Sequence, residues 1–330
     1  MSEEKEIWKD QKSGFNDALI YLNGRRLGNI KSILTPWYKF NEASTNGIEW
    51  NSTTVIGGRP AAGKTLIKDQ IIREAFKLNP DQTFRVLEFQ FEMLARTSAI
   101  REFSSHIGQS YKFLCSAEIG KTVTKEQIAI CHAYAKEKMK YPIDTVDIPV
   151  TVADFIKIIQ RYMEKYVTIV NGVKEYTSTI ITLDHTILLK KGPGEKDKMD
   201  TLYALGEALT YLKKMYPIAF IILSQLNRDI DRPERSEDGK YGNFILESDF
   251  FGADAMNQHA DILIGINKPS KHKIRYYGPE RFIIEPETLV LHFLKCRNGE
   301  TSMAFFKTEF QKMRIVEIPK PATQERKIKM

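Results

Sequence analysis

Short apolar runs alternate along most of this chain with stretches in which apolar residues recur every three or four positions. Six of the runs, rich in Ile, Val and Leu, have the length of buried strands and span residues 53–56, 85–91, 180–183, 218–223, 261–266 and 289–294. The stretches between them have helical periodicity, as at Ile67, Ile71 and Ala75. Strands that alternate with helices predict an α/β fold, in which helices flank a mostly parallel central sheet.

The two ends of the chain differ from this central pattern. The N-terminal part begins with a charged stretch and continues with apolar positions at helical spacing around Phe15 and Leu19. The last residues are basic and polar. We therefore expect an N-terminal arm or linker helix over residues 1–48, one main domain over residues 49–318 and a solvated basic tail over residues 319–330.

Composition favours a water-soluble, cytoplasmic protein with no membrane partner. Of the 330 residues 42% are hydrophobic, which is enough for a full core, and the longest apolar run, residues 218–223, is too short to cross a bilayer. The N-terminus is polar and lacks the pattern of a signal peptide. The widely spaced Cys115, Cys131 and Cys296 support neither a disulfide framework nor a zinc site.

The strongest chemical signal lies at residues 58–65, which fit the phosphate-cradling pattern G-x-x-x-x-G-K-[ST]. A β-branched run precedes this loop and a helical pattern follows it, as the motif requires. Backbone N–H groups of the loop would bind phosphate oxygens of ATP, while Lys64 would reach the β- and γ-phosphates and Thr65 would ligate Mg²⁺. The predicted ATP-binding residues are Gly58, Arg59, Pro60, Ala61, Ala62, Gly63, Lys64, Thr65 and Leu66.

Three further polar residues follow predicted strands at positions where nucleotide enzymes carry catalytic groups. Asp184 ends an apolar run and is a candidate ligand of Mg²⁺ or its waters. Glu92 follows the strand that contains Glu88, and because it lies nearer the strand end we prefer it to Glu88 as the group that activates water. Gln225 is placed to contact the γ-phosphate. Taken singly, an acid or amide that ends a strand has an ordinary alternative as a turn cap.

Basic residues point to a polyanionic partner. The formal net charge is +7, and two polar loops, residues 190–198 and 228–243, interrupt the strand pattern. Clustered Lys and Arg gain affinity by releasing counterions from a phosphate backbone. The candidate contacts with single-stranded DNA are Lys190, Lys191, Arg232, Arg235 and Phe251.

Lys295 and Arg297 flank Cys296 near the C-terminus, after a predicted strand. Side chains two positions apart on a strand share a face. Arginine stabilises the charge that develops in phosphoryl transfer when it is supplied in trans. These two cations are therefore candidate catalytic residues.

The ordered set of motifs resembles the ATPase domain of the DnaB-like replicative helicases, a RecA-type fold. Similar segments run colinearly from about Ser32 to Phe310 and include Gly-Arg-Pro-Ala-Ala-Gly-Lys-Thr at 58–65, Phe-Gln-Phe-Glu-Met at 89–93, Leu-Ser-Gln-Leu-Asn-Arg at 223–228, Asp-Ala-Met-Asn-Gln-His-Ala-Asp at 254–261 and Lys-Cys-Arg-Asn-Gly at 295–299. The resemblance implies that Lys64 and Thr65 bind ATP and Mg²⁺ and that Glu92 activates water. It also implies that Lys295 and Arg297 reach into a neighbouring subunit's site.

The same resemblance implies an ATP-dependent helicase that forms a homo-oligomeric, hexameric ring and moves 5′ to 3′ on single-stranded DNA in a bacterial cell or a phage-infected host. A helicase loader or a primase would be a further partner. Only about 48 residues precede the predicted domain, where the family carries a helical domain that docks primase, so we do not expect coupling to primase. At residues 248–253 this chain has Phe250 and Phe251 in place of the family's DNA-gripping stretch, and these rings either stack on bases or fill the core.

Three other functions remain open alternatives. A RecA- or RadA-like ATPase assembles on DNA without unwinding it. A small-molecule P-loop kinase acts as a monomer and shows no DNA-stimulated turnover. An assembly factor uses ATP only to stabilise a ring and therefore retains its function when Glu92 is replaced. The Phe-Glu-Met and Lys-x-Arg-Asn-Gly segments together favour the helicase.

Overall fold

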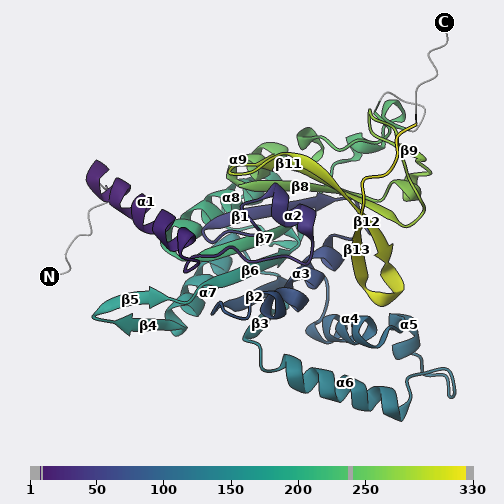
Figure 1. Ribbon diagram of the computed structural model, residues 1–330, viewed down its shortest axis with the longest axis horizontal. Coiled ribbons are helices and arrows are strands. Elements are labelled where there is room, and N and C mark those ends of the chain that lie inside the picture. Colours follow the sequence, from purple (N-terminus) through teal and green to yellow (C-terminus); the bar gives the residue numbers. More distant parts are fainter. Residues whose placement is uncertain (1–7, 9, 237–240, 325–330) are drawn as a thin grey trace, which may run out of the picture.

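A nine-stranded sheet forms the centre of the computed structural model, which describes residues 8, 10–236 and 241–324 (Figure 1). Along the sheet the strands are β13 (Arg314–Ile318), β12 (Ser302–Glu309), β11 (Thr288–Cys296), β8 (Ile262–Asn267), β1 (Ser52–Gly58), β7 (Ile218–Gln225), β6 (Thr179–Asp184), β2 (Arg85–Gln90) and β3 (Ile143–Val146). The strands from β8 to β3 run parallel, whereas β11, β12 and β13 extend the sheet in antiparallel fashion. The predicted mostly parallel α/β sheet is confirmed.

The six predicted strands are all present, as β1, β2, β6, β7, β8 and β11. The pattern did not identify the edge strands β3 and β13, nor β12, which lies between β13 and β11. Edge strands bury fewer side chains, and no residue of β3 is fully buried. Two further pairs of short strands lie outside the main sheet, β4 (Val167–Val170) with β5 (Val173–Tyr176) and β9 (Tyr276–Tyr277) with β10 (Phe282–Ile283).

Helices cover both faces of the sheet. One face packs against α7 (Val152–Lys165), α8 (Lys198–Met215) and α9 (Ala253–His259), and the other packs against α2 (Tyr38–Ala43) and α3 (Lys64–Leu78). Successive strand residues point to opposite faces, so Val55 belongs to the first core and Ile56 to the second. Parallel strands that are buried on both sides read as continuous apolar runs, which is why the sequence reveals them clearly.

Three helices form an excursion between β2 and β3 at the lower right of Figure 1: α4 (Ala95–Ile107), α5 (Tyr111–Leu114) and α6 (Lys125–Lys138). A reciprocal cap fixes the start of α6, because the Thr124 hydroxyl accepts from the backbone N–H of Gln127 and the Gln127 side chain accepts from that of Thr124. Short 3₁₀ turns complete the description: η1 (Thr186–Leu188), η2 (Arg228–Asp231), η3 (Pro233–Arg235), η4 (Glu247–Asp249), η5 (Pro269–His272) and η6 (Phe310–Lys312).

The N-terminal helix α1 (Gln11–Arg26) projects from the rest of the molecule (Figure 1). The Asp10 carboxylate accepts from the Ser13 N–H and caps its first turn. No residue of α1 is buried, and Phe15 and Leu19 are 63% and 64% exposed. The helix expected at this position is therefore present, but its apolar side chains have no buried contact within the described chain.

The residues that follow α1 belong to the main domain. Ile33, Trp37, Phe40 and Ile48 are buried in the core on the α3 side of the sheet. The Trp37 ring packs edge-on against Phe306 with 5.6 Å between ring centroids. The packing therefore changes at the end of α1 and not at residue 48. The sequence pattern misplaced this boundary because the segment contains only the short α2 and carries its apolar residues without a regular period.

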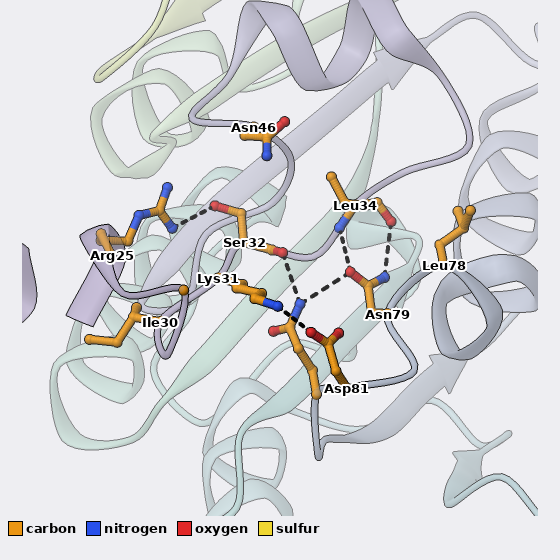
Figure 2. Close-up of a pocket in the computed structure, with 11 residues that line it drawn as sticks. Arg25, Ile30, Lys31, Ser32, Leu34, Asn46, Leu78, Asn79 and Asp81 are labelled. Carbon is orange, nitrogen blue, oxygen red and sulfur yellow. Dashed lines mark hydrogen bonds and ion pairs between the residues drawn. The ribbon is translucent and has the colours of Figure 1, made fainter.

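Figure 2 shows the hollow of about 440 Å³ at the joint between α1 and the domain. Arg25, in the last turn of α1, donates to the Ser32 hydroxyl at 3.0 Å and to the Thr45 carbonyl at 3.2 Å. Lys31 and Asp81 form an ion pair across the opening. The bonds of Arg25 attach the end of α1 to the domain, and these polar groups are engaged with one another rather than open to a ligand.

The described part of the C-terminal segment is attached to the domain. Ile283 donates its N–H to the Ala322 carbonyl at 2.9 Å, and Thr323 forms a bridge with Phe282. Residues 319–324 of the predicted tail are mostly exposed and are held to the domain by these contacts, and residues 325–330 of that prediction lie outside the described part. Over the described ranges, no helix has both the length and the apolar character needed to span a membrane.

Candidate nucleotide site

A tight loop joins β1 to α3 at the carboxyl ends of the parallel strands. Ala61 and Gly63 have φ angles of 56° and 103°, in the left-handed region. Glycine adopts such a conformation without steric cost. Gly63 directly precedes α3 and is its N-cap, so the free N–H groups of the first helical turn face the loop. This arrangement has the geometry of an anion site.

Lys64 is buried and folded back on the loop that carries it. Its ammonium donates to the Gly58 carbonyl at 2.7 Å and to the Arg59 carbonyl at 3.2 Å. Burial lowers the pKa of Lys64 to about 8, although the carboxylates of Asp184 and Glu92 act in the opposite direction. Two neutral carbonyl acceptors therefore hold the ammonium against the loop.

A cavity of about 620 Å³ opens beside this loop and gathers most of the predicted catalytic groups. Lys64 and Thr65 come from α3, Glu92 follows β2, Asp184 ends β6 and Gln225 ends β7. The remaining residues that line the cavity are Pro60, Ala61, Gly63, Leu66, Met93, Arg101, His185, Lys268, Lys271, Phe310 and Met313. The topology brings these strand ends together because ligand sites in parallel sheets lie outside the carboxyl ends of the strands.

Asp184 has the properties expected of a metal ligand. Its side chain is 2% exposed, and within the described chain its Oδ1 atom has no hydrogen-bond partner. A buried carboxylate oxygen without a partner is costly unless a cation binds it. Thr65 lines the same cavity. A carboxylate and a hydroxyl fit Mg²⁺, which prefers oxygen ligands.

Glu92 and Glu88 have different environments. Glu92 is exposed, and its Oε2 atom lies 3.9 Å from Nε2 of His185. Burial lowers the pKa of His185, which favours a neutral imidazole near pH 7. Glu88 is buried inside β2 and binds the ammonium of Lys68 at 2.9 Å. This ion pair explains a charged residue inside a buried strand.

Several residues of the cavity escaped the sequence analysis. Lys271 donates to the Ala61 carbonyl of the loop at 2.7 Å. The Lys268 ammonium lies 4.3 Å from the centre of the Phe310 ring, and Phe310 also lies beside Gly63. An aromatic wall flanked by cations suits a nucleobase and its phosphates. Arg101 enters from α4. The only local signal was the position of Lys268 directly after the β8 strand.

Lys295 and Arg297 lie at the opposite end of the parallel strands from the cavity, level with the start of β1. The backbone N–H of Arg297 donates to the Asp261 carbonyl, and the Asp261 N–H donates to the carbonyl of Thr53, at the start of β1. The five residue steps along the strand from Thr53 to Gly58 correspond to about 16 Å. Arg297 is 56% exposed and its Nε atom lies 3.3 Å from the Asp261 carboxylate. These two cations therefore lie away from the cavity of their own chain.

The candidate DNA contacts are distributed over two loops and one turn. Lys190 and Lys191 are exposed. Arg232 is exposed and forms an ion pair with Asp229 at 2.7 Å. Arg235 is 12% exposed, and both of its terminal nitrogens bind the buried Asp249 carboxylate.

The two adjacent phenylalanines have separate places. Phe250 is 1% exposed and its ring lies against Gly57 of β1, where an added Cβ atom would lie 2.2 Å from the ring. Phe251 is half-buried. Of the two alternatives for these rings, Phe250 fills the core, while Phe251 keeps an accessible surface.

The sheet, the phosphate loop and the acids around one cavity define a P-loop nucleoside triphosphatase of the RecA-like class. The chain belongs to the DnaB-like helicase C-terminal domain family, whose model matches residues 33–316. Family membership makes it the ATP-dependent motor of a DnaB-like replicative helicase, as the motifs predicted.

Two solved structures share the fold. One, a DnaB-like replicative helicase described with its interactions with primase, has a TM-score of 0.72 at 16% identity, over 92% of this chain and 68% of that one. The other, described as an ATPase domain, has a TM-score of 0.73 at 16% identity, over 92% of this chain and 98% of that one. The sequence matches no curated protein.

Proposed function

We propose that this chain hydrolyses ATP at the carboxyl edge of its sheet and that a ring of its copies uses this reaction to move along single-stranded DNA. The observation that carries the proposal is that five side chains from four separate elements line one cavity, namely Lys64, Thr65, Glu92, Asp184 and Gln225. Membership of the helicase family supports the same activity.

Lys64 is the proposed phosphate ligand. In the free protein its ammonium rests on two neutral carbonyls, and the β- and γ-phosphate oxygens are stronger acceptors because they are charged. Thr65 and Asp184 would hold Mg²⁺, which when bound neutralises phosphate charge. Phe310 and Met313 would contact the base at the apolar end of the cavity.

Glu92 is the proposed acceptor of the proton from the attacking water. The water oxygen bonds to the γ-phosphorus while the bond from that phosphorus to the bridging oxygen breaks, and ADP leaves with the bonding electrons. Gln225 is placed to contact the γ-phosphate and to respond when it departs. His185 lies 3.9 Å from the Glu92 carboxylate, which is too far for a hydrogen bond, so we assign it no step in this reaction.

Lys295 and Arg297 would complete the site of a neighbouring subunit. Their distance from their own phosphate loop, about 16 Å along the sheet, supports a role in trans. A ring whose subunits face one another in head-to-tail order places one edge of each sheet against the opposite edge of the next. We propose a hexamer on this basis and on the family resemblance.

Single-stranded DNA would bind through Lys190, Lys191 and Arg232, with Phe251 available to stack on a base. Arg235 is engaged by Asp249, so we assign it the support of its loop together with any phosphate contact. Binding of this type depends on salt and tolerates changes of base sequence. A primase or a helicase loader as a further partner rests on the family resemblance alone.

The deciding experiment measures ATP turnover with and without an oligo-dT strand, beside native mass and strand displacement from a forked duplex. We expect turnover that DNA stimulates, a hexameric mass and displacement in the 5′ to 3′ direction. DNA-stimulated turnover without displacement would instead support the RecA- or RadA-like function. A monomer whose turnover ignores DNA would overturn the proposal.

A further inference from the structure

The side chain of Arg59, the second residue of the phosphate loop, turns away from the nucleotide cavity. It does not line that cavity. Its guanidinium forms an ion pair with Asp231 in η2 and lies 3.5 Å from the Leu226 carbonyl. A residue of the phosphate loop therefore contacts the segment that follows Gln225, which also leads into the loop assigned to DNA.

The same residue also holds the phosphate-binding lysine. The Arg59 carbonyl accepts from the Lys64 ammonium at 3.2 Å. A triphosphate that draws Lys64 onto its own oxygens removes this bond from the Arg59 peptide. Arg59 thus carries two contacts, one that changes with nucleotide and one that reaches Asp231.

The segment beyond Gln225 is well anchored to its surroundings. The Asn227 N–H donates to the Asp249 carbonyl at 2.6 Å, and its side-chain amide donates to the Ser248 carbonyl at 2.8 Å. The Phe251 N–H donates to the Gln225 carbonyl at 2.8 Å. Residues 225–227 and 248–251 are therefore joined, so a displacement of one moves the other.

A buried residue fixes the orientation of η2. Ile230 is 1% exposed, and its carbonyl accepts from the Asn243 side chain at 2.7 Å. With Ile230 inside, Asp231 faces Arg59 while Asp229 and Arg232 face solvent and pair with each other. The turn consequently has one acid directed at the phosphate loop and one directed outwards.

We propose that the Arg59–Asp231 ion pair couples the phosphate loop to the DNA-facing segment 228–236, and that Asp231 is a positioning residue for DNA-stimulated hydrolysis. The inference rests on the proposed function. Partly exposed ion pairs are weak, so the loss of one hydrogen bond at the Arg59 peptide is enough to shift this contact. Coupling between two binding sites is reciprocal, so DNA on this segment changes the affinity for ATP by the same factor as ATP changes the affinity for DNA.

The test compares Asp231→Asn, which keeps the shape and removes the charge, with Asp229→Asn, the same change in the same turn on the acid that faces solvent. Turnover is measured without DNA and with saturating oligo-dT, and the affinity for a non-hydrolysable ATP analogue is measured in both states. For Asp231→Asn we expect unstimulated turnover within about twofold of the natural protein and stimulation reduced by about fivefold or more. Asp229→Asn releases Arg232 from its ion pair and can therefore change the affinity for DNA, but at saturating oligo-dT it should keep full stimulation.

Two further measurements separate the explanations. Asp231→Glu retains a carboxylate that reaches Arg59 and should restore most of the stimulation, which a purely structural loss would not produce. Thermal unfolding of all three variants should match the natural protein, because Asp231 is partly exposed. Full stimulation in Asp231→Asn overturns the coupling while the proposed function stands. A natural protein that DNA does not stimulate overturns the proposed function itself, and the coupling with it.

Discussion

At the scale of single residues, the molecule contains a second buried lysine one helical turn beyond the phosphate lysine. Lys68 is fully buried, and burial alone would remove its charge, but the carboxylates of Asp69 and Glu88 outweigh that effect and raise its pKa. The ion pair between Lys68 and Glu88 joins α3 to β2, the strand that precedes Glu92. If Glu88 is replaced, Lys68 keeps Asp69 as a carboxylate partner at 2.7 Å but loses its link to β2.

The two glutamates of this strand should respond differently to the same substitution. Glu92→Gln is expected to bind ATP yet hydrolyse it at least about a hundredfold more slowly, because a proton acceptor is lost, with unchanged thermal stability. Glu88→Gln should lower the free energy of unfolding by about 1–3 kcal/mol, since Lys68 keeps Asp69 as a partner, and should leave turnover of the folded fraction nearly intact. Chemical denaturation and turnover of both variants check this, and an exchange of the two phenotypes would show that Glu88 is the catalytic group.

Lys64 makes nucleotide binding sensitive to alkaline pH. Its pKa of about 8 in the free protein lies below the ordinary value because of burial. The side chain is therefore mostly charged below pH 8 and loses its proton above that pH. Phosphate binds the charged form, so affinity should be constant on the acid side and fall about tenfold between roughly pH 7 and pH 9. Calorimetric titration of a non-hydrolysable ATP analogue measures this.

A matched variant separates Lys64 from other titrating groups. In Lys64→Arg the side chain stays charged throughout this range, so its remaining affinity should not change with pH. A natural protein whose affinity is equally flat would show that the Lys64 ammonium does not limit binding.

At the scale of elements, the local sequence pattern was enough to predict the buried strands. It was not enough to predict the residues that reach the cavity from other elements. The strands of the parallel region were recognisable because both of their faces are buried. The same strands indicated three of the candidate groups, because Asp184 and Gln225 end such strands and Glu92 follows one. Arg101, Lys271 and Phe310 were not predictable, since they reach the cavity from a helix and two turns whose positions depend on tertiary packing.

The two neighbouring phenylalanines test the difference between packing and binding within one turn. Phe250→Ala should lower the free energy of unfolding by about 3–5 kcal/mol, because it opens a cavity against Gly57 of β1. Phe251→Ala should lower stability less than Phe250→Ala, because its ring is only partly buried against the core, and should weaken binding of single-stranded DNA by about 1–3 kcal/mol. Denaturant titrations and salt-controlled DNA titrations check both. An unchanged DNA affinity in Phe251→Ala would remove the stacking role.

At the scale of the whole molecule, the sheet separates two parts of one proposed active site. The cavity lies at the carboxyl ends of the parallel strands, and Arg297 lies level with their beginnings. Neither local sequence nor a single chain reveals how these parts meet. A neighbour that presents its own Arg297 edge to this cavity would complete the site.

Mixing two inactive variants tests this arrangement. Lys64→Ala and Arg297→Ala should each lose about a thousandfold or more of turnover alone, the second with much less effect on ATP affinity. In mixed rings some interfaces pair an intact Lys64 with an intact Arg297, so partial turnover should return. Native mass confirms that mixed rings form. If they form and remain inactive, Arg297 does not act on a neighbour's nucleotide.

The separation of the cavity from Arg297 also limits ATP hydrolysis by subunits that have not assembled. A single newly made chain would hold nucleotide in a pocket that lacks its finishing cation, and so would turn it over at a negligible rate. Turnover per subunit should then rise with protein concentration until assembly is complete. Dilution should abolish turnover without unfolding the protein. ATP would then be hydrolysed only by assembled rings.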